Sequence, residues 1–161
     1  MDAPRFAVDR TLGRLARWLR VLGFDAACRA ELPGDRLLTF AAREDRVVLT
    51  RDGRLRCPRG RARVVRIASD RFRDQLRELD RSFPLGGAEH RPARCVECNL
   101  ELEPLAADRV PATVPEYVRA TQQDFKRCAR CRRVYWPATH RARIDAEIAA
   151  LALSPPGDAH A

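Results

Sequence analysis

The sequence contains almost no lysine and no long apolar run. Lys126 is the single lysine beside 30 arginines. No apolar stretch approaches the roughly 20 residues that a membrane-spanning helix needs. Arg5 and Asp9 interrupt the apolar core that an N-terminal signal peptide would require. These absences favour a soluble, cytoplasmic protein without a membrane partner.

Positive charge is concentrated in the first half of the chain. The formal net charge is +9; residues 1–83 contribute +8, from 20 arginines and 12 acidic residues, and residues 84–161 contribute +1. A basic balance favours a polyanionic partner such as nucleic acid. Composition bias from a GC-rich coding sequence is the alternative. It explains the preference for arginine over lysine, but not the excess of basic over acidic residues.

Short apolar runs alternate with helical patterns over residues 1–83. Phe6-Ala7-Val8 predicts a buried strand, and the apolar stripe that follows recurs at helical spacing until Gly23, a typical residue just past a helix end. The stripe consists of Leu12, Leu15, Ala16, Leu19 and Leu22. Further strands are predicted over residues 25–29, 46–50 and 64–67, and further helices begin at Asp35 and after Ser69-Asp70. This alternation is typical of an α/β fold with a mostly parallel sheet flanked by helices.

The alternation of predicted strands and helices ends at residue 83. Residues 84–92 are rich in proline and glycine and predict a linker between residues 1–83 and a second module. Residues 93–153 hold two cysteine pairs and a terminal helix, whose apolar stripe includes Ile144, Ile148 and Leu151. Residues 154–161 predict a disordered tail.

Two C-x-x-C pairs in the second module predict a zinc site. They are Cys95 with Cys98 and Cys128 with Cys131. Two such turns together place four thiolates in the tetrahedral arrangement of structural Zn²⁺, and such a closed site has no open position for substrate. Redox dithiols or disulfides are the alternative. A reducing cytosol disfavours disulfides, and neither pair clearly follows a strand and opens a helix, as a thioredoxin-like motif does.

Acidic residues follow two of the predicted strands and begin a helix beside them. Asp9 follows the first strand, Asp52 follows the strand over residues 46–50, and Asp35 begins the helix before that strand. Since parallel strands end, and the following helices begin, at one edge of the sheet, we expect the three carboxylates to converge there. Carboxylates forced together repel unless a cation lies between them. Oxygen ligands suit Mg²⁺ or Mn²⁺, which activate water for attack on a phosphodiester.

A purely structural interpretation also fits these positions. Asp9, Asp35 and Asp70 lie where a helix N-cap belongs, and Asp52 fits an Arg-Asp-Gly turn. Basic residues near these aspartates favour the metal site, because they can hold a phosphate backbone across the carboxylates. These are Arg14 and Arg17 on the first helix, and Arg51, Arg54, Arg56, Arg59, Arg61 and Arg63 after Asp52 or beside it.

Several of these segments, in this order, resemble the Mut-seven C-terminal RNase domain family. Its opening is matched by Phe6-Ala7-Val8-Asp9, by Leu12-Gly13-Arg14-Leu15-Ala16-Arg17-Trp18-Leu19-Arg20 and by Leu22-Gly23-Phe24-Asp25. Its second signature is similar to Leu49-Thr50-Arg51-Asp52. Its zinc ribbon is similar to Arg94-Cys95, Cys98-Asn99 and Cys128 to Cys131 with Val134-Tyr135-Trp136 and His140. The resemblance covers about residues 5–145.

The resemblance implies a PIN-like nuclease domain followed by a zinc ribbon, and a metal-dependent ribonuclease activity. Asp9, Asp35 and Asp52 match the acidic residues of the PIN-like site, and Asp70 is the candidate for a fourth, with a helix cap as its alternative. In this interpretation RNA is bound by Arg14, Arg17, Arg51, Arg54, Arg56 and Arg59. The sequence departs from the family pattern at Arg132-Arg133, where a glycine often follows the last cysteine.

Two hypotheses compete with a ribonuclease. One is a non-catalytic RNA- or ribosome-binding module, and the other is a toxin-like PIN protein with a protein partner. A ribonuclease requires Asp9 and Asp52 to lie close together without an arginine partner. A binding module is favoured if Arg14 or Arg51 forms an ion pair with either carboxylate.

Overall fold

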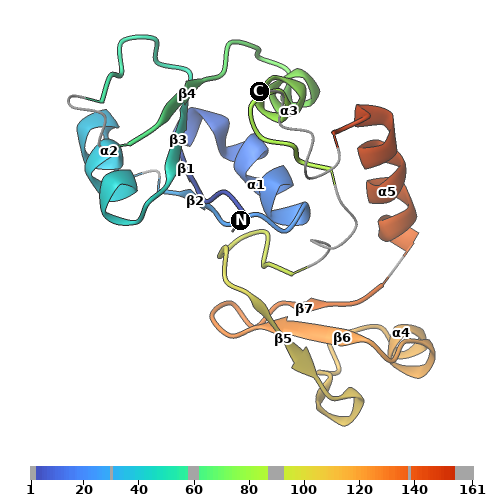
Figure 1. Cartoon of the computed structure of the whole chain (residues 1–161). Coiled ribbons are helices and arrows are strands. Elements are labelled where there is room, and N and C mark those ends of the chain that lie inside the picture. Colours follow the sequence, from blue (N-terminus) through green and yellow to red (C-terminus); the bar gives the residue numbers. More distant parts are fainter. Residues whose placement is uncertain (1–2, 30, 58–61, 87–92, 138, 155–161) are drawn as a thin grey trace.

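The chain forms a parallel α/β unit and a small antiparallel module that lies below it in Figure 1. The structure is a computed structural model that describes residues 3–29, 31–57, 62–86, 93–137 and 139–154, without the side chains of residues 139–143. Within these ranges, no helix is both long and apolar enough to cross a membrane.

The α/β unit is built on four parallel strands in the order β2-β1-β3-β4. They are β1 (Phe6–Val8), β2 (Ala26–Cys28), β3 (Val47–Thr50) and β4 (Val64–Arg66). All three residues of β1 are fully buried, because helices cover both faces of a parallel sheet. Each strand lies where the sequence predicts one, and the α/β fold with a mostly parallel sheet is confirmed.

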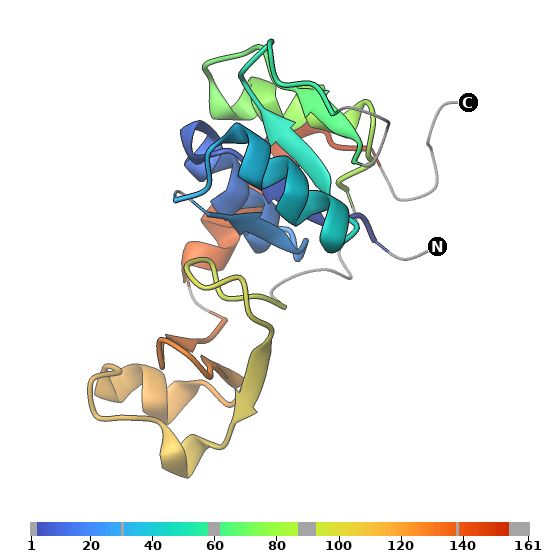
Figure 2. The ribbon, with the colours of Figure 1, turned by 90° about the vertical axis from the view of Figure 1, so that its left-hand side faces the viewer.

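Helices lie on both sides of this sheet (Figures 1 and 2). They are the short 3-10 helix η1 (Arg10–Leu12), α1 (Gly13–Val21), α2 (Gly34–Arg43) and α3 (Phe72–Asp80). α1 and α3 pack against Phe6 and Val8, whereas α2 packs on the opposite face against Ala7 and Val48. Gly23 follows α1 with a φ of 95°, a conformation that favours glycine, so the predicted end of this helix is confirmed.

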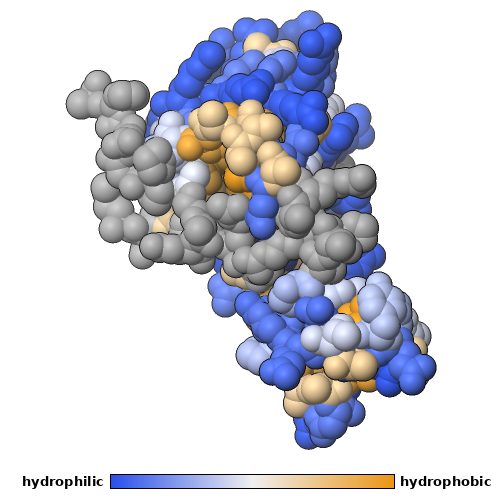
Figure 3. Space-filling view, turned by 90° about the vertical axis from the view of Figure 1, so that its right-hand side faces the viewer, coloured by the Kyte–Doolittle hydropathy of each residue, from blue (hydrophilic) through white to orange (hydrophobic). Residues whose placement is uncertain are grey.

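The last helix, α5 (Thr139–Leu151), packs on the α/β unit. Ile148 and Leu151 join the core that α1 and α3 form with the sheet, and Glu147 accepts hydrogen bonds from the Arg73 guanidinium on α3. This differs from the expected division of the chain, which grouped the terminal helix with the cysteine pairs. Figure 3 looks onto this side and shows a small apolar group within a mostly hydrophilic surface of the α/β unit.

Parts of the expected linker and tail are built into the same core. Leu85 is fully buried, and its amide donates to the Asp80 carboxylate (2.8 Å). That carboxylate also accepts from the amide (2.9 Å) and the hydroxyl (2.8 Å) of Ser154. Asp80 therefore ties both segments to the end of α3. Residues 87–92 of the expected linker and 155–161 of the expected tail lie outside the described residues.

The cysteine module, defined as residues 93–137, is an antiparallel sheet in the order β5-β6-β7. Its elements are β5 (Leu102–Leu105), η4 (Ala107–Arg109), α4 (Glu116–Thr121), β6 (Phe125–Cys128) and β7 (Val134–Tyr135). Its small core holds Leu105, Val110, Val114, Val118 and Phe125. The sequence did not predict α4, because a short helix with a single buried residue has no apolar stripe.

Polar contacts hold the cysteine module against α1 and β2. Arg20 on α1 is buried, and its guanidinium donates to the Ala26 carbonyl on β2 (2.9 Å) and to the two carbonyls between the first cysteines (2.7 and 3.0 Å). Asn99 accepts from the Ala26 amide (2.9 Å) and donates to the Asp25 carboxylate (2.6 Å). The turn of the first cysteine pair is therefore bonded directly to the start of the edge strand β2.

We expect Asp25 to make part of the chain's stability depend on acid pH. Burial disfavours its ionised form, but hydrogen bonds from Arg46 and Asn99 outweigh this and lower the pKa of Asp25. Its contribution to the free energy of unfolding is therefore complete above the unfolded pKa of about 3.9. The contribution is lost as the pH falls through the lower folded pKa.

Urea unfolding of wild type and Asp25→Asn measures this contribution. The difference in unfolding free energy should be largest near neutral pH and should shrink below about pH 4. Asp108→Asn changes an exposed carboxylate in η4 and serves as the control, whose small difference should not vary. A gap for Asp25→Asn that stays constant with pH would contradict the expectation.

Candidate functional site

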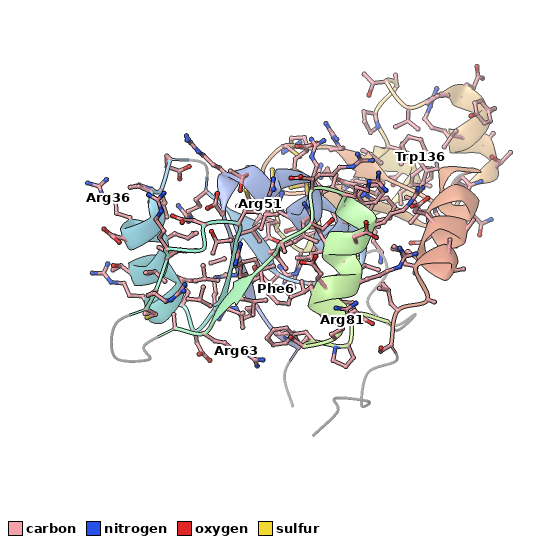
Figure 4. All side chains as sticks on the ribbon, turned by 90° about the horizontal axis from the view of Figure 1, so that it is seen from above. Phe6, Arg36, Arg51, Arg63, Arg81 and Trp136 are labelled. Carbon is pink, nitrogen blue, oxygen red and sulfur yellow. The ribbon has the colours of Figure 1, made fainter. Side chains whose placement is uncertain are left out.

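Asp9 and Asp52 lie at the ends of two neighbouring strands and share one buried hydroxyl. β1 pairs with β3, and the Asp9 amide donates to the Leu49 carbonyl (2.9 Å). The hydroxyl of Thr50, which is fully buried, donates to Asp9 Oδ2 (3.0 Å) and accepts from the Asp52 amide (3.0 Å). The parallel sheet thus brings the two acidic residues together at what we call the acidic edge. Figure 4 looks down on this edge, with Arg51 beside α1.

One oxygen of each carboxylate, Oδ1, accepts hydrogen bonds from residues close in sequence. Asp9 Oδ1 accepts from the amide (2.9 Å) and hydroxyl (3.2 Å) of Thr11, which makes Asp9 the N-cap of η1. Asp52 Oδ1 accepts from the Arg54 amide (2.8 Å) and closes the turn after β3. The Oδ2 atom of Asp52 has no hydrogen-bond partner in the described part of the chain. The cap at Asp9 and the turn at Asp52 therefore coexist with unused oxygen lone pairs.

Asp35 lies at the start of α2, on which the loop after Asp52 packs. It lies in the first turn of that helix, and its exposed carboxylate has no hydrogen-bond or ion-pair partner among the residues that the structure describes. A Cβ at Gly34 would lie 2.8 Å from Leu55 Cδ1, so the loop that follows Asp52 packs directly on the start of α2. Asp35 does not cap α2 with its side chain.

Asp70 has a different partner from the other three acidic residues. It is exposed and forms an ion pair with Arg51, the residue before Asp52. The alternative that Asp70 caps α3 is wrong, because the Ser69 hydroxyl accepts from the Arg71 amide (3.1 Å) and α3 has no side-chain cap. The Arg51–Asp70 pair therefore joins the loop after β3 to the start of α3.

The two predicted RNA-binding arginines on α1 have neighbours away from the carboxylates. Arg14 lies over the ring of Phe72, with its Cζ atom 3.9 Å from the ring centroid. Arg17 forms an ion pair with Glu97 of the cysteine module. The Arg17 guanidinium is thus paired with the cysteine module and is not free for RNA.

The basic loop after β3 lies on the surface beside Asp52. Arg54 and Arg56 are exposed, and Arg56 donates to the Gly53 carbonyl (2.6 Å). Arg59, also predicted to contact RNA, lies outside the described residues. No ion pair between described residues joins an arginine to Asp9 or Asp52.

A cavity of about 340 Å³ opens beside Asp52, between this loop and β4. It is lined by Asp52, Leu55, Arg56, Cys57, Ala62, Val64 and Arg66. The two arginines give it a cationic wall next to the acidic edge. The sequence did not indicate this cavity, because only the pairing of β3 with β4 brings its two sides together.

The four paired cysteines form the cysteine centre. Their Sγ atoms all lie within 4.8 Å of one another, and those of Cys95 and Cys131 are 3.6 Å apart. This spacing fits four ligands at the Zn–S distance of about 2.3 Å. Within the described ranges, it is the one group of three or more potential ligands close enough to share an ion, and the carboxylates at the acidic edge are not so tightly grouped.

The surroundings of Cys95 favour its thiolate form. Burial disfavours its thiolate, but hydrogen bonds from the Tyr135 hydroxyl and from the amides of Cys98 and Glu97 outweigh this and lower the pKa of Cys95 to about 6. A thiolate is the form that binds a metal ion. The centre therefore offers one of its two buried sulfurs in a form close to that of a ligand.

The family model of the Mut7-C RNAse domain matches residues 4–148. The chain belongs to the Mut7-C RNAse domain family. The matched range includes the acidic edge, the cysteine centre and most of α5, and the resemblance drawn from the motifs is confirmed. Neither the search of curated proteins nor that of solved structures gave a match.

Three residues of this Mut7-C chain that shape the site escaped the sequence analysis. Thr50 and Asn99 belong to the quoted motifs, where they lie close to Asp52 and next to Cys98. Their place in the motifs was the signal that could have identified them. Arg20 also lies inside a quoted motif, but two of its three carbonyl partners are 76 and 77 residues further along the chain, so the sequence does not indicate what it binds.

Replacing Arg132 with glycine is expected to stabilise the cysteine centre of the Mut7-C chain. Arg132 follows the last cysteine with a φ of 63°. This conformation costs a residue with a Cβ roughly 1–2 kcal/mol, whereas glycine adopts it freely. The greater freedom of glycine in the unfolded chain offsets part of the gain, so Arg132→Gly should stabilise by up to about 1 kcal/mol.

Urea unfolding of the protein with added Zn²⁺ checks this expectation. Arg130→Gly is the matched control, because Arg130 is exposed in the same turn without a positive φ. It should lower stability, since it adds only unfolded-state freedom. Equal losses in both variants would show that Arg132 carries no backbone strain.

Proposed function

We propose that this Mut7-C chain is a metal-dependent ribonuclease that hydrolyses RNA phosphodiester bonds at the acidic edge, with one structural zinc in the cysteine centre. The arrangement of Asp9, Thr50 and Asp52 supports this proposal most directly. It links the Asp9 carboxylate to the backbone amide of Asp52 through one hydroxyl. No ion pair in the described part of the chain joins an arginine to either carboxylate. Family membership supports RNA as the substrate.

Each acidic residue has a proposed role. Asp9 and Asp52 hold Mg²⁺ or Mn²⁺, and Asp35 completes the site, because carboxylate oxygens are the ligands these ions prefer. Asp52 Oδ2 and the Asp35 carboxylate have no hydrogen-bond partner in the described part of the chain. The bound cation supplies an activated water and stabilises charge during attack on the phosphodiester. The Thr50 hydroxyl positions the Asp9 carboxylate directly and Asp52 through its backbone amide. Asp70 positions Arg51 rather than binding metal, because its carboxylate is already paired.

Arginines around the acidic edge hold the RNA backbone. Arg51, Arg54 and Arg56 follow β3 directly and are exposed, and Arg59 is proposed as a further contact in the same loop. Phosphate contacts of this kind position nucleic acid without reading its sequence. The cysteine module lies at the other end of α1 from Asp9, so zinc has a structural rather than a catalytic role.

A non-catalytic RNA-binding module is the alternative. An ion pair of Arg14 or Arg51 with Asp9 or Asp52 would favour that hypothesis. Arg51 instead pairs with Asp70, and Arg14 lies over the ring of Phe72. The two functions are separated by incubating mixed RNA with the zinc-loaded chain, with and without added Mn²⁺. Cleavage that depends on added Mn²⁺ supports the ribonuclease; binding without cleavage supports the alternative.

A further inference from the structure

An aromatic stack lies on the surface of α1 and α3 beside the acidic edge. Trp18 on α1 and Phe72 at the start of α3 stack with their ring centroids 5.5 Å apart and 18° between their planes. The Arg14 guanidinium lies over the same Phe72 ring, 3.9 Å from its centroid. We use the term aromatic stack for Arg14, Trp18 and Phe72.

The fold connects the aromatic stack to the acidic edge from two sides. Arg14 lies in the first turn of α1, directly after η1, which Asp9 caps. Phe72 begins α3 just after Asp70, whose ion pair with Arg51 joins this segment to the residue before Asp52. A strand of RNA bound at the acidic edge therefore has the aromatic stack among its nearest neighbours.

Arg14 is held in place but keeps its hydrogen-bond donors unused. It is exposed and has no ion-pair partner among the described residues. Glu147 on α5 interacts electrostatically with Arg14, but its carboxylate already accepts two hydrogen bonds from Arg73. Stacking on Phe72 orients the guanidinium plane without consuming its N–H groups, which match phosphate in geometry.

We propose that the aromatic stack is a subsite for an unpaired base of the RNA and its phosphate. The subsite rests on the proposed function, because it takes RNA as the substrate. Bases stack on aromatic rings and on arginine planes, which is worth about 5-fold to 150-fold in affinity for each base. Bases inside an RNA duplex are stacked on each other and are not available to such a surface.

Binding of two hexanucleotides to the full, zinc-loaded Asp52→Asn chain tests the subsite without cleavage. One probe is a fluorescently labelled uridine hexamer, and the other is the same strand with abasic sugars, which keeps every phosphate. Fluorescence anisotropy at one salt concentration gives both dissociation constants. We expect the uridine strand to bind about tenfold more tightly.

Two substitutions in the Asp52→Asn chain assign that preference to the aromatic stack. Arg14→Lys keeps the charge and loses the stacking plane, so the tenfold ratio should fall toward one while affinity for the abasic strand is unchanged. Phe72→Leu keeps an apolar side chain at the start of α3 and removes the ring, and it should lower the ratio likewise. Arg81→Gln, exposed at the other end of α3, should leave the ratio as it is.

Each outcome separates the subsite from the proposed function. A ratio near one before substitution, or one that both substitutions leave unchanged, would overturn the subsite and leave the aromatic stack as packing between α1 and α3. A tenfold ratio that Arg14→Lys abolishes supports the subsite. If the wild-type chain then fails to cleave RNA with Mn²⁺, the ribonuclease proposal fails while base binding stands.

Discussion

Asp52→Asn is expected to slow RNA cleavage at least about 100-fold while leaving stability without divalent cations equal or higher. The asparagine keeps the shape of the side chain and an Oδ1 atom that can accept from the Arg54 amide. It removes one negative charge from the edge where the Asp9 carboxylate and the Asp52 amide share the Thr50 hydroxyl. Carboxylates held together repel in the absence of a cation, so removing one relieves repulsion.

Two measurements check this expectation. Cleavage rates of labelled RNA with Mn²⁺ report the loss of function, and urea unfolding without Mn²⁺ reports stability. Asp108→Asn, which removes an exposed carboxylate from the cysteine module, should change neither. Cleavage by Asp52→Asn at the wild-type rate would remove the acidic edge as the metal site and with it the ribonuclease proposal.

Substitutions at Asp9 separate its cap from its proposed metal role. Asp9 accepts from Thr11 with one oxygen and from Thr50 with the other. Asn caps nearly as well as Asp, whereas Ala at an N-cap costs about 1 kcal/mol. Both substitutions should therefore stop cleavage, but only Ala should lower the melting temperature clearly. If Mn²⁺ stabilises Asp9→Asn as much as wild type, Asp9 is a cap alone.

The acidic edge could be predicted because it depends on local patterns and one rule of topology. Asp9 and Asp52 each follow a short apolar run, and parallel strands end at the same edge. The cysteine centre was predictable for a similar reason, since each C-x-x-C pair forms its own turn. In both sites the fold then has to bring two local units together: two strand ends at the acidic edge and two cysteine turns at the cysteine centre.

Contacts between segments far apart in sequence were not predictable in the same way. Nothing near Asp70 shows that it pairs with Arg51 rather than capping α3. The apolar stripe of α5 predicted a helix, but its packing on α3 depends on Ile148 reaching a core built by the first half of the chain. Arg20 resembled the other arginines of α1, although it is buried against the turn of the first cysteine pair.

Cys95→Ser is expected to remove zinc and to destabilise the α/β unit as well as the cysteine module. Metal analysis of the wild-type chain should find about one zinc, and the variant should find none. The centre sets the path of the turn between the first two cysteines, whose carbonyls accept from Arg20. Without zinc, this buried guanidinium keeps only the Ala26 carbonyl on β2. A hydrogen bond to a charged group contributes about 1.5–3 kcal/mol. Losing those of Arg20 should therefore also destabilise α1 and β2.

A double-mutant cycle measures how much of this loss passes through Arg20. Arg20→Met keeps a long apolar stem in the core and removes the charge, so zinc removal should then cost less by about 1.5–3 kcal/mol in unfolding free energy. Arg17→Gln is the control on the same helix, because its exposed ion pair with Glu97 should show little coupling. If Arg20→Met and Cys95→Ser destabilise additively, zinc supports the cysteine module alone. A coupling confined to Arg20 means that the zinc site also stabilises α1, the helix that begins beside Asp9, from the opposite end.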